Sequence, residues 1–114
     1  MYVIDRGVAI IRPKQPFVDW INGLPDAEMK VTLDDLRNDC LAVLISPFVS
    51  EEDAMEEIAE LYAEIFTAEL TDWCPEQTWW PQRRDLEAFR QWFDIEVHAL
   101  VTDPFDEEIR KEPY

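Results

Sequence analysis

Residues 50–73, SEEDAMEEIAELYAEIFTAELTDW, carry the pattern that most restricts the fold of this 114-residue chain. Ser50 has the character of a helix N-cap, and the acidic residues that follow it suit the first turn of a helix. Apolar side chains then recur at helical spacing: Met55, Ile58, Leu61, Tyr62, Ile65, Phe66 and Trp73. A helix over this segment would be roughly 34 Å long, because each residue adds about 1.5 Å. That length is enough to cross one face of a β-sheet.

Three segments have the pattern of strands that could form such a sheet. Residues 7–12, GVAIIR, and residues 40–46, CLAVLIS, are short apolar runs, and Val3 and Ile4 could extend the first of them. Residues 94–102, DIEVHALVT, alternate instead, with the following side chains on one face: Ile95, Val97, Ala99 and Val101. The alternation predicts a last strand with one face less buried than the other.

Three shorter helices complete the expected elements. A helix over 16–23 begins at a proline and ends at a glycine, which is the usual asymmetry of helix ends. A helix over 33–38 follows a capping box formed by Thr32 and Asp35, with Val31 and Leu36 at the positions of a hydrophobic staple. A helix over 82–93 is predicted from its apolar positions, Leu86, Phe89 and Phe93.

The order of elements is therefore β-α-α-β-α-α-β, which predicts an α+β fold. We expect a two-layer sandwich with a small, mainly three-stranded sheet and the helices packed on one face. Connections that carry helices allow neighbouring strands to be parallel or mixed. Residues 1–104 are expected to form a single domain, followed by a partly ordered acidic tail over 105–114.

The net charge limits the classes of partner. Twenty-six acidic residues against 10 basic ones leave a formal charge of −16. Such a field repels nucleic acid and anionic membranes and attracts basic proteins, so we expect neither a nucleic-acid-binding nor a membrane protein. Cys40 and Cys74 are too few for a disulfide framework, and the N-terminal residues lack the long apolar region of a signal peptide. A soluble, cytoplasmic protein is the resulting expectation.

The acidic residues are concentrated in one interval. No lysine or arginine lies between Arg37 and Arg83, and this interval holds eleven acidic residues. Within the long helix, four like-charge pairs are spaced i,i+4: Glu52–Glu56, Asp53–Glu57, Glu56–Glu60 and Glu60–Glu64. Each such pair costs a helix a few tenths of a kcal/mol. The predicted partner-binding residues are Glu52, Asp53, Glu56, Glu57, Glu60 and Glu64, with a solvated face or weak divalent-cation binding as the alternatives.

The stretch CPEQTWWPQRR, residues 74–84, offers a second candidate site. Arg83 and Arg84 lie at the start of the predicted 82–93 helix, which is the unfavourable end for positive charge. Either ion pairs with the preceding acidic helix offset this charge, or the two arginines form an anion pocket with Trp79 and Trp80 as its walls. Adjacent side chains in an extended segment point in opposite directions. One tryptophan is therefore expected to fill a seam between helices while the other lies nearer to solvent.

No pattern of catalytic residues accompanies these features. His98 is the only histidine, and it shares a strand face with Glu96, but no further His or Cys nearby could complete a zinc site. A Cys40–His98 pair would need an exposed thiol, which an apolar strand does not provide. We therefore expect a structural histidine, no catalytic residues, no metal and no cofactor.

The sequence thus predicts a non-enzymatic acidic domain that docks a basic partner through the 51–72 helix. The alternative is a domain that binds a small anionic ligand, or acts on one, around Trp79, Trp80, Arg83 and Arg84. A homo-oligomer whose interface is formed by exposed aromatic side chains is a third hypothesis. Its subunits would have to overcome the repulsion between two chains of charge −16.

Overall fold

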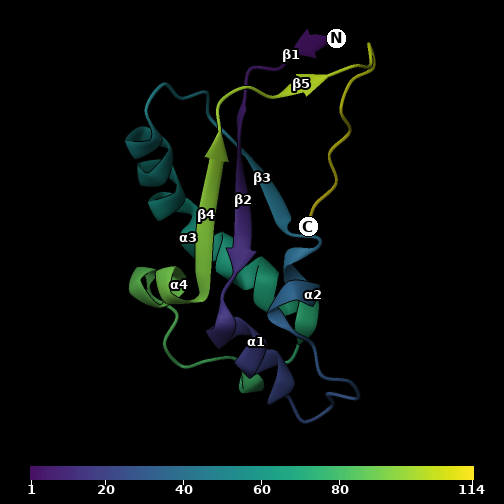
Figure 1. Cartoon of the computed structure of the whole chain (residues 1–114), viewed down its shortest axis with the longest axis vertical. Coiled ribbons are helices and arrows are strands. Elements are labelled where there is room, and N and C mark those ends of the chain that lie inside the picture. Colours follow the sequence, from purple (N-terminus) through teal and green to yellow (C-terminus); the bar gives the residue numbers. More distant parts are fainter.

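The computed structural model describes all 114 residues and has an α+β fold with a three-stranded antiparallel sheet (Figure 1). The strands of this sheet are β2 (Gly7–Pro13), β3 (Leu41–Ile45) and β4 (Phe93–His98), in the order β3-β2-β4. The helices are α1 (Gln15–Asn22), α2 (Leu33–Arg37), α3 (Glu51–Trp73) and α4 (Leu86–Trp92), with a short 3₁₀ helix, η1 (Gln77–Trp79), between the last two. The α+β fold class predicted from the sequence is confirmed.

The core lies between one face of the sheet and the helices. α3 crosses behind the sheet at an oblique angle (Figure 1), and its apolar stripe meets the inward side chains of the strands. The buried residues come from α1, α3, α4 and the sheet, and the largest are Phe17, Phe66, Phe89, Phe93, Ile11, Ile45 and Leu70. Four of these are aromatic rings in mutual contact, with neighbouring centroids 4.9 to 5.8 Å apart. This aromatic cluster joins α1, α3 and α4 to the start of β4.

The expectation of parallel or mixed neighbouring strands was wrong. β2 pairs antiparallel with both of its neighbours: Ile11 lies opposite Leu41 on one side and Ile95 on the other. The reason is the placement of α1 and α2, which lie beyond the end of β2, so that the chain turns there and returns as β3 (Figure 1). Only α3 crosses the sheet face, and it brings β4 back parallel to β3 with β2 between them.

A short N-terminal segment and the residues that follow β4 form a separate strand pair that was not predicted from the sequence. β1 (Tyr2–Val3) pairs antiparallel with β5 (Thr102–Asp103), so Val3 does not extend β2 and the predicted 94–102 strand is divided. β1 and β2 are separated by residues 4–6, and β2 begins at Gly7. A Cβ atom there would lie 2.6 Å from Cε1 of Phe48, so the close approach of the Phe48 ring requires glycine.

The remaining helix boundaries were predicted with one clear error. The capping box of α2 is present: Thr32 Oγ1 accepts from the backbone N–H of Asp35, and the Asp35 carboxylate accepts from the backbone N–H of Thr32. α4, however, begins at Leu86 and not near residue 82. Its N-cap is Asp85, whose carboxylate accepts from the backbone N–H of Ala88 at 2.8 Å.

The C-terminal segment returns towards the sheet. It runs down from β5 and ends beside β3 (Figure 1), where the Tyr114 hydroxyl donates to the Asp72 carboxylate at 2.5 Å. This hydrogen bond to Asp72 raises the pKa of Tyr114 to about 12. The last residue is thereby attached to α3.

Candidate functional site

The exposed acidic residues of α3 form the first candidate site. α3 contains nine acidic residues and no basic one, and the outward side chains of its first four turns include Glu52, Asp53, Glu56, Glu60 and Glu64. The six ion pairs of the structure lie elsewhere: on Asp5, Asp94, Asp85, Glu87 and Glu96. No residue of α3 takes part in any of them. We call Glu52, Asp53, Glu56, Glu60 and Glu64 the acidic face of α3.

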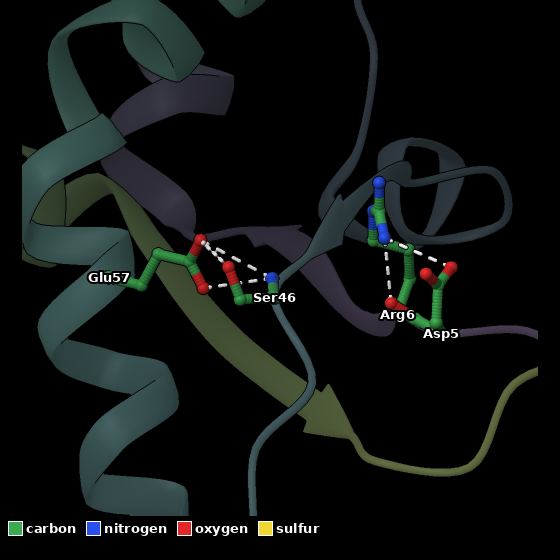
Figure 2. A network of polar contacts seen from close by, with 4 residues as sticks. All are labelled: Asp5, Arg6, Ser46 and Glu57. Carbon is green, nitrogen blue, oxygen red and sulfur yellow. Dashed lines mark hydrogen bonds and ion pairs between the residues drawn. The ribbon is translucent and has the colours of Figure 1, made fainter.

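Glu57 differs from the other predicted partner-binding residues. Its carboxylate accepts from the Ser46 hydroxyl at 2.8 Å and from the Ser46 backbone N–H at 3.0 Å (Figure 2). These bonds attach the first turns of α3 to the residue that follows β3. Glu57 is therefore engaged within the chain. This could not be predicted from the sequence, because residues 46 and 57 are brought together only by the fold.

Glu69 and Trp73 also depart from the pattern expected of α3. Only 7% of the Glu69 surface is exposed. Burial, assisted by the neighbouring Asp72 carboxylate, raises the pKa of Glu69 from about 4.5 to about 7. Trp73, in contrast, was expected in the apolar stripe and is 41% exposed; it is the last residue of the helix, whereas Leu70, three residues earlier, is fully buried.

The two adjacent tryptophans point in different directions, as predicted. Trp80 packs against the core and donates its indole N–H to the carbonyl of Cys74 at 2.7 Å, whereas Trp79 is 53% exposed. The backbone carbonyl of Trp79 accepts from the indole N–H of Trp20 at 2.9 Å. The first bond closes the 74–80 segment on itself, and the second attaches it to α1.

The arginine pair is engaged locally, although not with the preceding helix. Arg83 forms ion pairs with Asp85 at 3.1 Å and Glu87 at 2.6 Å, both in or next to the first turn of α4. Arg84 donates to the carbonyl of Pro81 and lies over the Trp80 ring, with its guanidinium carbon 5.7 Å from the ring centroid. The anionic-ligand alternative stays a prediction, and it would require Arg83 to exchange these partners.

A cleft that sequence reasoning missed lies at the C-terminal end of α3. Its volume is about 600 Å³, and two segments distant in the sequence line it: the 24–29 loop and residues 73–79. Trp73 and Trp79 contribute exposed rings, and the buried Ile21 also lines the cleft. Asp26, Glu28 and Glu76 supply carboxylates. The exposed Met29, at 81%, is a further apolar wall. Two nearby exposed tryptophans could have signalled the cleft, but only the fold brings the 24–29 loop beside them.

The histidine and the cysteines do not form a reactive centre. His98 Nε2 lies 2.9 Å from Glu96 Oε2 on the exposed face of β4, and this contact lowers the pKa of Glu96. Cys40 precedes β3 at the opposite end of the sheet, since Leu41 pairs with Ile11 and His98 pairs with Val8. Burial raises the pKa of the Cys40 thiol. No cluster of three or more His, Cys, Asp or Glu side chains is placed to hold a metal ion.

Comparison with protein-family models, with curated proteins and with solved structures found no match to this chain. None of its helices combines the length and apolar character that crossing a membrane requires. The functional argument therefore rests on the residues and their geometry.

Proposed function

We propose that this protein is a binding module that docks a basic protein through the acidic face of α3. The observation that supports the proposal most strongly is the absence of cationic partners along this face. An ordinary surface helix alternates its charges and gains stability from i,i+4 pairs, whereas Glu52, Glu56, Glu60 and Glu64 repel one another at that spacing. A lysine- or arginine-rich surface would relieve this repulsion when the complex forms.

The rest of the molecule gives this face a rigid support. α3 is held to the sheet by its buried side chains, including Ile58, Ile65 and Phe66, and at one end by the Ser46–Glu57 bonds. A face presented by a packed helix loses little conformational freedom on binding, which favours affinity. The net charge of −16 adds a long-range attraction that increases the rate of encounter with a basic protein.

The test is a comparative capture experiment. The wild-type chain and a variant carrying Glu52→Gln, Glu56→Gln, Glu60→Gln and Glu64→Gln are immobilised and exposed to a nuclease-treated lysate of the source organism. A matched control carries Asp106→Asn, Glu107→Gln, Glu108→Gln and Glu112→Gln, which removes the same number of charges from the exposed C-terminal segment. Bound proteins are eluted with increasing salt and identified by mass spectrometry.

We expect one basic protein to be retained by the wild-type chain and by the control, and to be strongly depleted on the α3 variant. Equal recovery on all three baits would reject the acidic face as the docking site. Recovery lost equally on both variants would mean that net charge alone is responsible, and this result would also contradict the proposal.

A further inference from the structure

The cleft at the C-terminal end of α3 combines aromatic walls with carboxylates and contains no basic side chain. Its charged residues are Asp26, Glu28 and Glu76, and its most exposed apolar side chains are Trp73, Trp79 and Met29. A volume of about 600 Å³ lies within the range of small-ligand sites, which is roughly 300–1,000 Å³. The chemistry of this lining restricts what the cleft can accept.

Glu76 is fixed in position at the edge of the cleft. Its Oε1 accepts from both the hydroxyl and the backbone N–H of Thr78, at 2.8 and 3.2 Å, and these bonds lower the pKa of Glu76. The carboxylate is therefore ionised at neutral pH, and its Oε2 accepts no hydrogen bond from the protein. Glu76 and the rings of Trp73 and Trp79 line the same cleft, so the cleft contains a charged carboxylate with one oxygen that the protein leaves without a hydrogen-bond donor.

We propose that this cleft binds the side chain of a lysine or arginine from the basic partner, held between the indole rings and the carboxylates. Indole faces attract cations electrostatically, and the aliphatic stem of a long basic side chain can pack on the same apolar walls. This inference rests on the proposed function and adds to it a specific pocket for one side chain of the partner.

Other occupants fit the lining less well. An anion would meet three carboxylates without a base to offset them. A second copy of the chain would bring its own charge of −16 to an acidic rim. A metal ion would gain no ligand from the tryptophan walls, and no metal-binding cluster is present.

The position of the cleft agrees with a shared partner. Trp73 lies nine residues beyond Glu64 on the same helix, which is about 14 Å along the axis at 1.5 Å per residue and about two and a half turns further, so the two side chains leave opposite sides of α3. An extended segment that reaches both must pass around the helix as well as along it, and so needs about twice the four residues that the axial distance alone requires at about 3.3 Å per residue. One basic segment can therefore contact the acidic face of α3 and insert a side chain into the cleft.

The test uses a short probe that carries a single ammonium group. Acetyl-Gly-Lys-Gly-amide is titrated into the full chain at 0.15 M salt, and NMR follows the indole N–H signals of Trp73 and Trp79 together with the Met29 methyl group. The same tripeptide with norleucine in place of lysine keeps the aliphatic stem and removes the charge. We expect saturable shifts of these three residues with the lysine probe and none with the norleucine probe.

Trp79→Ala should weaken binding of the probe about fivefold, the ratio that corresponds to about 1 kcal/mol of cation–π attraction. Glu76→Gln should weaken it about twofold, since a neutral amide replaces the free carboxylate oxygen. Phe105→Ala and Glu112→Gln, at exposed positions outside the cleft, are the matched controls and should leave the affinity unchanged. The Trp79 side chain is largely exposed, so its removal leaves the core intact, and Glu76→Gln provides an independent readout.

Three results would each contradict the proposal that the cleft binds a basic side chain. They are equal binding of the norleucine probe, an unchanged affinity in Trp79→Ala, or lysine-induced shifts confined to α3 residues 52–64. The α3 variant with four glutamines separates the two proposals. If the lysine probe still shifts the cleft signals in this variant, the cleft binds the probe independently of the acidic face of α3. If these shifts are present but the capture experiment fails, only the proposal that the acidic face docks a basic protein is rejected.

Discussion

Glu69 is the one acidic residue of α3 that faces the interior, and its surroundings are unfavourable for a charge. It lines a pocket with Phe17, Leu36 and Cys40, whose other charged residues are the acidic Asp35 and Asp39, and the Asp72 carboxylate lies nearby. Transfer into such surroundings disfavours ionisation, and a neighbouring negative charge adds to the effect. The folded protein consequently holds a proton on Glu69 at pH values where the unfolded chain has released it.

This proton makes the stability of the protein depend on pH. The folded pKa of Glu69 is about 7 and its ordinary value is about 4.5, so the folded state binds more protons between these limits. The contribution of Glu69 is therefore fully present below pH 4.5 and is lost as the pH rises through 7. Glu69→Gln, which is neutral throughout, should become more stable relative to the wild type by roughly 3 kcal/mol between pH 4.5 and pH 8.

Urea unfolding of both proteins at pH 5 and pH 8 measures this difference. Glu64→Gln removes a charge from an exposed position of the same helix and serves as the control. A stability difference between Glu69→Gln and the wild type that is the same at both pH values would contradict the account.

At the scale of elements, the start of α4 depends on Asp85. One carboxylate oxygen caps the helix through Ala88, and the other pairs with Arg83. Asp85→Ala should lower the melting temperature by about 4–8 °C, since an N-cap contributes on the order of 1 kcal/mol in a domain of this size. Thermal unfolding followed by circular dichroism checks the expectation.

Asp85→Ala removes both the helix cap and an ion pair with Arg83, and Glu87→Ala tests which of the two losses lowers the melting temperature. It removes the other partner of Arg83 and leaves the cap intact. Because an exposed ion pair contributes little, this change should leave the melting temperature nearly unchanged. An equal effect of the two substitutions would mean that capping is not the cause.

The repulsion along α3 predicts that the free protein is less stable than it could be. Replacing Glu56 and Glu60 by glutamine removes three of the four like-charge pairs at i,i+4 spacing. The free energy of unfolding should increase by roughly 1 kcal/mol at low salt, and the gain should shrink as salt screens the charges. Denaturant unfolding at 0.02 M and 0.5 M salt measures the effect, and a loss of stability at low salt would contradict it.

Most helices and strands could be predicted from patterns within a few turns of chain. Elements that depend on pairing with a distant segment could not. The Thr32–Asp35 capping box and the apolar stripe of α3 are signals contained within a few turns of chain, and both were read correctly. The strand β1 was missed because two residues such as Tyr2 and Val3 carry no pattern of their own, and they become a strand only by pairing with β5. The start of α4 was misplaced because the helical spacing of apolar residues was extended past its N-cap.

The candidate sites show the same limit at the scale of the whole molecule. The acidic face could be predicted because it follows from the spacing of residues within one helix. The cleft beside Trp79 could not, because it exists only where the 24–29 loop meets the end of α3. The engagement of Glu57 by Ser46 likewise depends on how β3 and α3 pack. A site formed by residues of one helix can be predicted from the sequence. A site formed by segments that are distant in the sequence becomes visible only in the structure.

The central claim is that charge on one face of α3 drives the binding of a basic protein. The most direct measurement is the dissociation constant of the captured partner at 0.05 M and 0.3 M salt, for the wild type, the α3 variant with four glutamines and the C-terminal control. We expect the α3 variant to bind at least tenfold more weakly than the wild type at low salt, and this ratio should be smaller at high salt. The reason is that salt screens the attraction between exposed charges, over about 8 Å at physiological ionic strength. The control should resemble the wild type. Dissociation constants that are the same for the wild type and the α3 variant at both salt concentrations would contradict the account.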